Sequence, residues 1–252
     1  MQARTPPKLK TLLNTDRAGG QPVAVVLAGH NGSGKSTLWY DRLADDLQMP
    51  LVNADRLTLS LLPPADADQK LRAWASRLRD EDERWQRLAQ ESVQLFMGLV
   101  MDQGMSFAFE TVFSYLKLKP DGSFQSKTDL IRMLQEHGYF VFLLFVGLAS
   151  AELSISRLST RKRQGGHDVS ETKLRSRFPR TQQAVGMASE VADLTLMFDN
   201  SRGLNHAFTL VRAQQRQKTL YDCRDGSFKQ DPDLVEVAGI WLAKVAPESA
   251  PS

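Results

Sequence analysis

Short apolar runs alternate along this chain with longer segments of helical periodicity. Strands are predicted over residues 23–28, 50–54, 106–109, 139–146 and 194–198, because each run is short, apolar and bounded by glycine, proline or polar residues. Runs without a polar face are typical of strands buried on both sides of a parallel sheet. Helical patterns between the runs supply the crossovers. The pattern therefore predicts an α/β fold, with a parallel sheet flanked by helices.

Helical spacing of apolar residues is found over residues 35–47, 68–101, 125–136, 151–162 and 170–188. The second of these segments is long enough to form a helical insertion. Its tryptophans, Trp74 and Trp85, fit core packing at that spacing better than stacking on a nucleobase. After residue 201, two more edge strands and a terminal helix are expected.

Composition bounds the class of protein. The chain has 252 residues, of which 42% are hydrophobic and 24% charged, and these values fit one globular domain that carries insertions. A net charge of +3 does not predict a nucleic-acid partner. No apolar run approaches the roughly 20 residues of a membrane span, and residues 1–7 lack a signal-peptide core, so we expect a cytoplasmic protein. The single cysteine, Cys223, is expected to be an inert thiol.

The segment between the first strand and the first helix matches the phosphate-loop pattern Gly-x4-Gly-Lys-Ser. It consists of Gly29, His30, Asn31, Gly32, Ser33, Gly34, Lys35 and Ser36, and Thr37 follows it. Backbone N–H groups at a helix N-terminus lack intrahelical partners and bind anions. Lys35 is expected to reach the β and γ phosphates, and Ser36 to ligate Mg²⁺. The loop thus predicts a site for ATP and Mg²⁺.

Three acidic residues follow predicted strands, at the edge of the sheet where ligands collect in open parallel folds. Asp55 is the candidate general base, because one helix and one strand separate it from the phosphate loop. Glu110, together with Thr111, is expected to hydrogen-bond the phosphoryl acceptor. Alternatively, Glu110 caps a loop. Asp199 serves either the site or only the N–H groups of its own turn.

Residues 157–180 are rich in arginine and surround a Gly165-Gly166 pair, which suits a lid. Arg161 and Arg163 precede the glycines and Arg177 follows them, so closure would bring guanidinium groups onto the phosphates from both sides. The alternative for this charge run is a solvated helix face. His167 fits a structural role better than a catalytic one.

Taken together, these segments resemble the zeta toxin family of P-loop kinases. The resemblance covers about residues 22–201 and rests on the phosphate loop, Asn53-Ala54-Asp55, Phe109-Glu110-Thr111-Val112-Phe113-Ser114, Arg161 to His167 with Asp168-Val169, and Arg177-Phe178. Larger members carry an arginine shortly after the glutamate-threonine pair, where this chain has Val112-Phe113-Ser114.

The resemblance implies an enzyme that uses ATP to phosphorylate a sugar hydroxyl of UDP-N-acetylglucosamine or a related UDP-amino sugar. It also implies a small antitoxin protein as partner. The implied roles are ATP and Mg²⁺ binding for Lys35 and Ser36, general base for Asp55, acceptor binding for Glu110 and Thr111, and phosphate binding by the lid arginines Arg161 and Arg177.

Other functions share the same nucleotide half of the site. They are a kinase for another small metabolite, such as a nucleoside or an antibiotic, and a nucleotide-dependent switch without an acceptor. For the domain organisation, we expect an N-terminal tail over 1–21, a kinase domain over 22–201 with its lid at about 157–180, and a C-terminal extension over 202–252 that packs on the same domain.

Overall fold

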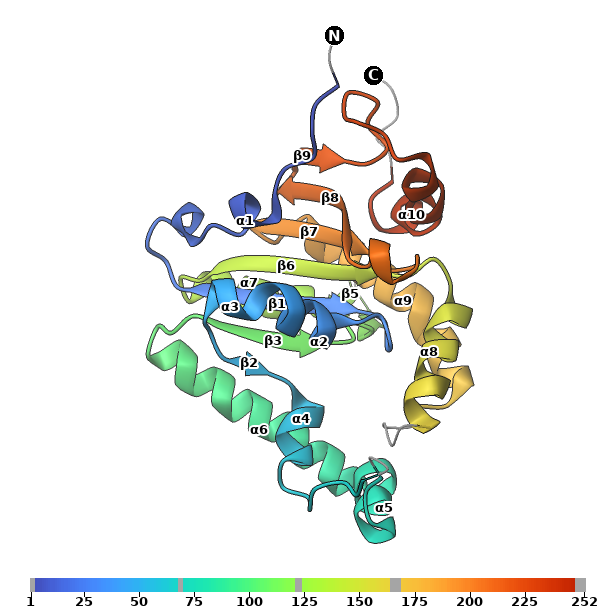
Figure 1. The fold of residues 1–252 in the computed structure, drawn as a ribbon. Coiled ribbons are helices and arrows are strands. Elements are labelled where there is room, and N and C mark those ends of the chain that lie inside the picture. Colours follow the sequence, from blue (N-terminus) through green and yellow to red (C-terminus); the bar gives the residue numbers. More distant parts are fainter. Residues whose placement is uncertain (1–2, 68–69, 121–123, 164–168, 248–252) are drawn as a thin grey trace.

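The computed structural model describes residues 3–67, 70–120, 124–163 and 169–247, apart from the side chains of residues 86 and 161–163 (Figure 1). In this part of the chain, seven strands form one sheet in the order β2-β3-β1-β6-β7-β8-β9. The strands are β1 (Val23–Gly29), β2 (Leu51–Val52), β3 (Phe107–Thr111), β6 (Phe140–Gly147), β7 (Leu194–Asp199), β8 (Thr209–Gln215) and β9 (Lys218–Asp222). The first five strands in that order are parallel, and β8 and β9 are antiparallel.

Helices lie on both faces of the sheet (Figure 1), which confirms the predicted fold class. They are α1 (Leu9–Leu12), α2 (Lys35–Leu38), α3 (Ala44–Leu47), α4 (Ala54–Leu59), α5 (Ala73–Glu81), α6 (Glu83–Asp102), α7 (Thr128–Glu136), α8 (Ala151–Arg163), α9 (Glu171–Ser189) and α10 (Pro232–Val245). A π-helical turn, Trp39–Leu43, joins α2 to α3. Short 3₁₀ turns occupy Thr15–Ala18 and Leu204–His206. Among the described helices, none is long and apolar enough to cross a membrane.

Two predicted segments differ from the structure. The strand expected over 50–54 ends at Val52, because the side chain of Asn53 accepts a hydrogen bond from the backbone N–H of Arg56 and caps α4. The carboxylate of Asp55 therefore lies in the first turn of a helix, and the prediction that it directly ends a strand is wrong. The helix expected from residue 125 begins at Thr128, since residues 124–126 form β5 (Phe124–Ser126), which pairs with β4 (Leu116–Leu118).

The core is centred on β1 and β6, whose residues are buried along both strands. Segments from both ends of the chain contribute to the same core. Leu12 and Ala18 enter it before β1, and Trp241 and Leu242 enter it from α10. The residues at the two ends of the described chain therefore pack onto the same core as the central sheet.

Candidate functional site

The glycine-rich segment turns directly from the carboxyl end of β1 into α2. Gly32 and Gly34 have φ angles of 68° and 95°, a conformation that glycine adopts without strain. A Cβ atom at Gly34 would lie 2.8 Å from Nδ2 of Asn200 and 3.0 Å from Cε1 of Phe208. Glycine is therefore required at this position both by backbone conformation and by space.

The ammonium group of Lys35 is folded over the loop, and the residue is only 6% exposed. Its Nζ donates to the backbone oxygens of Gly29 and His30, at 3.3 and 3.0 Å, and lies 3.7 Å from Oε1 of Glu110. The loop thus holds one buried positive charge beside its own carbonyl groups.

Glu110 lies beside the phosphate loop because β3 pairs in parallel with β1, with Leu27 opposite Glu110. Its Oε2 accepts hydrogen bonds from Oγ of Ser36 and Nδ2 of Asn53, both at 2.7 Å. The ends of β1, β2 and β3 are thereby joined through one carboxylate. The structure brings Lys35, Ser36 and Glu110 together at the carboxyl edge of the sheet, where the sequence analysis expected a ligand.

For the other predicted site residues, the structure gives the element and, where the side chain is described, its burial. Asp55 is exposed, two residues after Asn53, and Thr111 is half-buried at the end of β3. Arg177 is half-buried on α9, where burial, followed by the charge of Arg180, lowers its guanidinium pKa. The backbones of Arg161 and Arg163 belong to α8, but their side chains lie outside the described residues, as do Gly165, Gly166, His167 and Asp168.

The alternative structural role of Asp199 is confirmed. Its carboxylate is fully buried and accepts a hydrogen bond from the backbone N–H of Ser201. The neighbouring Asn200 was not predicted to contribute to the site, yet its side chain donates to the backbone oxygen of Ser33 at 2.8 Å. No spacing signal predicts this contact, since the two residues are 167 positions apart.

His30 was likewise not predicted to have a role. Its ring is 3% exposed and stacks on the ring of Phe178 from α9, with centroids 3.8 Å apart. Burial, and then the nearby charge of Lys35, lower the pKa of His30 to about 3. The imidazole is therefore neutral at physiological pH and packs the phosphate loop against α9.

The buried state of His30 makes stability depend on pH. The pKa of this residue is about 3 in the folded protein against an ordinary value of 6.5, so the unfolded chain binds more protons between these values. The free energy of unfolding then rises by up to about 1.4 kcal/mol per pH unit across that window. Above the window it levels off. We expect the free energy of unfolding, measured with urea at several pH values, to rise less steeply with pH for His30→Gln than for the wild type. Equal slopes would contradict the buried neutral imidazole.

Three buried polar atoms of the loop have no hydrogen-bond partner within the described chain: Nε2 of His30, Oδ1 of Asn31 and Oγ of Ser33. Buried polar groups normally find partners. A loop with buried orphaned groups, a buried ammonium and backbone N–H groups at a helix start fits the binding of a polyphosphate.

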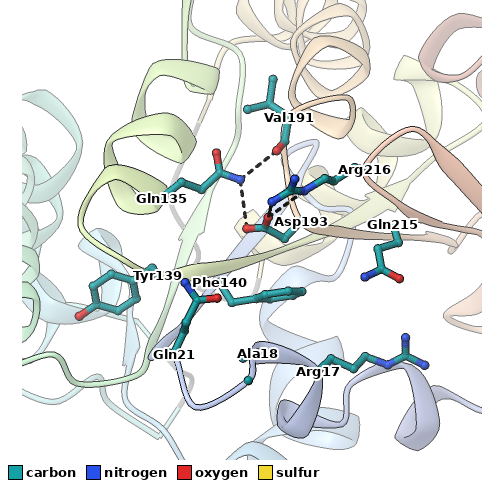
Figure 2. A pocket seen from close by; sticks show the side chains of 11 residues that line it. Arg17, Ala18, Gln21, Gln135, Tyr139, Phe140, Val191, Asp193, Gln215 and Arg216 are labelled. Carbon is teal, nitrogen blue, oxygen red and sulfur yellow. Dashed lines mark hydrogen bonds and ion pairs between the residues drawn. The ribbon is translucent and has the colours of Figure 1, made fainter.

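A polar cavity of about 720 Å³ lies at the opposite edge, where β1, β6 and β7 begin (Figure 2). Its buried carboxylate, Asp193, accepts hydrogen bonds from Gln135, Arg216 and the backbone N–H of Val141. Figure 2 shows Gln135 and Arg216 pointing at Asp193. These hydrogen bonds tie α7, β6 and the turn after β8 together around Asp193, at the edge of the sheet opposite the phosphate loop.

The parallel strands and the glycine-rich loop at the end of β1 define a nucleotide-binding P-loop fold. The chain belongs to the zeta toxin family, which it matches over residues 9–203. This confirms the resemblance found in the sequence, and the protein is a kinase that acts as an ATP-dependent phosphotransferase.

Individual relatives are distant. An uncharacterised protein of Haemophilus influenzae is 24% identical over 158 residues, which cover 63% of this chain and 94% of that protein. A solved chain of the PezAT chromosomal toxin-antitoxin system of Streptococcus pneumoniae is 14% identical, with a TM-score of 0.52 over 96% of this chain and 85% of that one. The AvrRxo1-ORF1:-ORF2 structure with ATP gives 15% identity and a TM-score of 0.57, over 96% and 69%. At these identities the structures show the shared fold.

Proposed function

We propose that this kinase transfers the γ-phosphoryl group of ATP to a sugar hydroxyl of UDP-N-acetylglucosamine or a related UDP-amino sugar. The observation that carries the proposal is the convergence of Lys35, Ser36 and Glu110 at one edge of the sheet, beside the start of α4. In this arrangement an ammonium group and a hydroxyl both lie within contact of one carboxylate.

The nucleotide half of the proposed site uses these residues. The loop amides and Lys35 bind the β and γ phosphates. The hydroxyl of Ser36 and the carboxylate of Glu110 would hold Mg²⁺, since they supply the oxygen ligands it prefers, and the bound ion would neutralise charge on the phosphate oxygens. Since Oε2 of Glu110 is shared by Ser36 and Asn53, we propose that this carboxylate orients the metal ligands as well as the acceptor.

The acceptor half supplies the proton transfer. Asp55 takes the proton of the acceptor hydroxyl, whose oxygen forms a bond to the γ phosphorus. The bond from that phosphorus to the bridging oxygen breaks, and ADP leaves with the electron pair. Thr111 hydrogen-bonds the acceptor, and Arg161, Arg163 and Arg177 neutralise the charge on the moving group.

We also propose a small antitoxin protein as partner. Support comes from the PezAT toxin-antitoxin system and from AvrRxo1-ORF1, which is seen in complex with ORF2. The antitoxin is expected to block the nucleotide site.

Mass spectrometry tests the substrate. The protein is incubated with ATP, Mg²⁺ and a panel of UDP-amino sugars, nucleosides, antibiotics and simple alcohols. We expect a gain of about 80 Da, one phosphoryl group, on a UDP-amino sugar and on no other acceptor. Phosphorylation of a nucleoside or an antibiotic instead would make the protein a kinase of that metabolite. No product on any acceptor would favour a nucleotide-dependent switch.

A further inference from the structure

The segment that follows β7 supports the phosphate loop from outside. Asn200 is 7% exposed, and its Nδ2 donates to the backbone oxygen of Ser33, which is fully buried. The same Nδ2 lies 2.8 Å from the position that a Cβ atom would take at Gly34. The amide of Asn200 is therefore packed against the peptide bond that joins Ser33 to Gly34.

The orientation of that peptide determines where its N–H group points. In a trans peptide, the carbonyl oxygen and the N–H group lie on opposite sides of the bond, and this chain has no cis peptide among its described residues. A hydrogen bond that turns the carbonyl of Ser33 toward Asn200 turns the N–H of Gly34 away from it. The N–H of Gly34 therefore faces the side of the loop opposite Asn200, where it can donate to an anion.

Asn200 is itself held by buried contacts on both sides. Its neighbour Asp199 accepts a hydrogen bond from Nε1 of Trp241 at 3.0 Å and from Oγ of Ser201 at 2.7 Å. Nη2 of Arg157, on α8, donates to the backbone oxygen of Asn200 at 2.7 Å. Trp241 is fully buried on α10, which lies beyond the residues matched by the family.

We propose that Asn200 is a positioning residue that fixes the Ser33–Gly34 peptide for phosphate binding, and that Trp241 on α10 holds Asn200 in place through Asp199. The C-terminal helix α10 then helps to fix the geometry of the nucleotide site. This inference rests on the proposed binding of a triphosphate by the loop.

Calorimetry with two probes tests this role, using Mg²⁺·ATP and Mg²⁺·tripolyphosphate without an acceptor. Asn200→Ala removes a buried donor, so binding should weaken by about tenfold. Because the contact acts on the phosphate loop, the loss should be the same for both probes. Trp241→Phe keeps an aromatic ring beside Phe145 but removes the N–H donor to Asp199, and should weaken both by about threefold. The control is Trp74→Phe: this tryptophan is 49% exposed, so the core packing expected from its spacing is wrong, and the variant should bind as the wild type does.

The binding results distinguish the positioning role of Asn200 from the triphosphate site itself. Loss of ATP binding alone, with tripolyphosphate unchanged, would show that Asn200 recognises the nucleobase and would overturn the positioning role. Wild-type affinity in both variants would also overturn it. If Asn200→Ala does not fold, as judged by circular dichroism, Trp241→Phe decides alone. Failure of the wild type to bind either probe would instead refute the triphosphate site itself.

Discussion

Lys35→Met should lower kcat for phosphoryl transfer by about 10² to 10³-fold, the scale of losing one group that stabilises the charge of the transition state. Methionine is of similar length and apolar, so it suits a side chain that is 6% exposed. Among the contacts that it removes are those to the neutral backbone oxygens of Gly29 and His30 and, at 3.7 Å, to Glu110. The fold should therefore survive, while the positive charge at the phosphates is lost.

The measurement is the steady-state rate with saturating acceptor, together with the midpoint of thermal unfolding. Lys10→Met is the matched control, because Lys10 is exposed and pairs with Asp46 at the surface. The control should keep wild-type activity. A Lys35→Met protein that turns over at more than about a tenth of the wild-type rate would contradict the role given to this ammonium.

Asp55→Asn should lower kcat by about 10² to 10⁴-fold, the usual contribution of a general base. The amide is nearly the same size as the carboxylate but does not accept the proton. Asp55 is exposed in the first turn of α4, so the substitution should change neither the stability of the fold nor the affinity for ATP. The loss should appear in kcat and leave the dissociation constant of ATP unchanged.

Asp45→Asn controls for the removal of an exposed acid, since Asp45 lies on α3 at the surface. It should behave as the wild type does. If Asp55→Asn loses less than about threefold in kcat while Glu110→Gln loses the full amount, the proton is taken by Glu110 and the assignment of the base is wrong.

The sequence predicted the strands well where burial leaves no polar face. β1 and β6 are apolar throughout and lie in the sheet centre, so their patterns are unambiguous. β2 was overextended because the capping role of Asn53 competes with a weak strand signal. The β4–β5 hairpin was missed because its strands have only three residues each, and five of these six residues are exposed or half-buried.

The site residues were predictable where they stand next to one another in the sequence. Lys35 and Ser36 belong to one contiguous motif. The contact of Glu110 with Ser36 follows once β3 is known to adjoin β1. Neither the contact of Asn200 with Ser33 nor the stacking of His30 on Phe178 was predictable, because each depends on how distant elements pack over the loop.

A crystal structure with a non-hydrolysable ATP analogue, Mg²⁺ and UDP-N-acetylglucosamine tests the central claim most directly. The account predicts the β and γ phosphates within the loop against Lys35, and a sugar hydroxyl within about 3 Å of the carboxylate of Asp55 and facing the γ phosphorus. A sugar nucleotide bound elsewhere, or a γ phosphate that points away from Asp55 and Glu110, would contradict it.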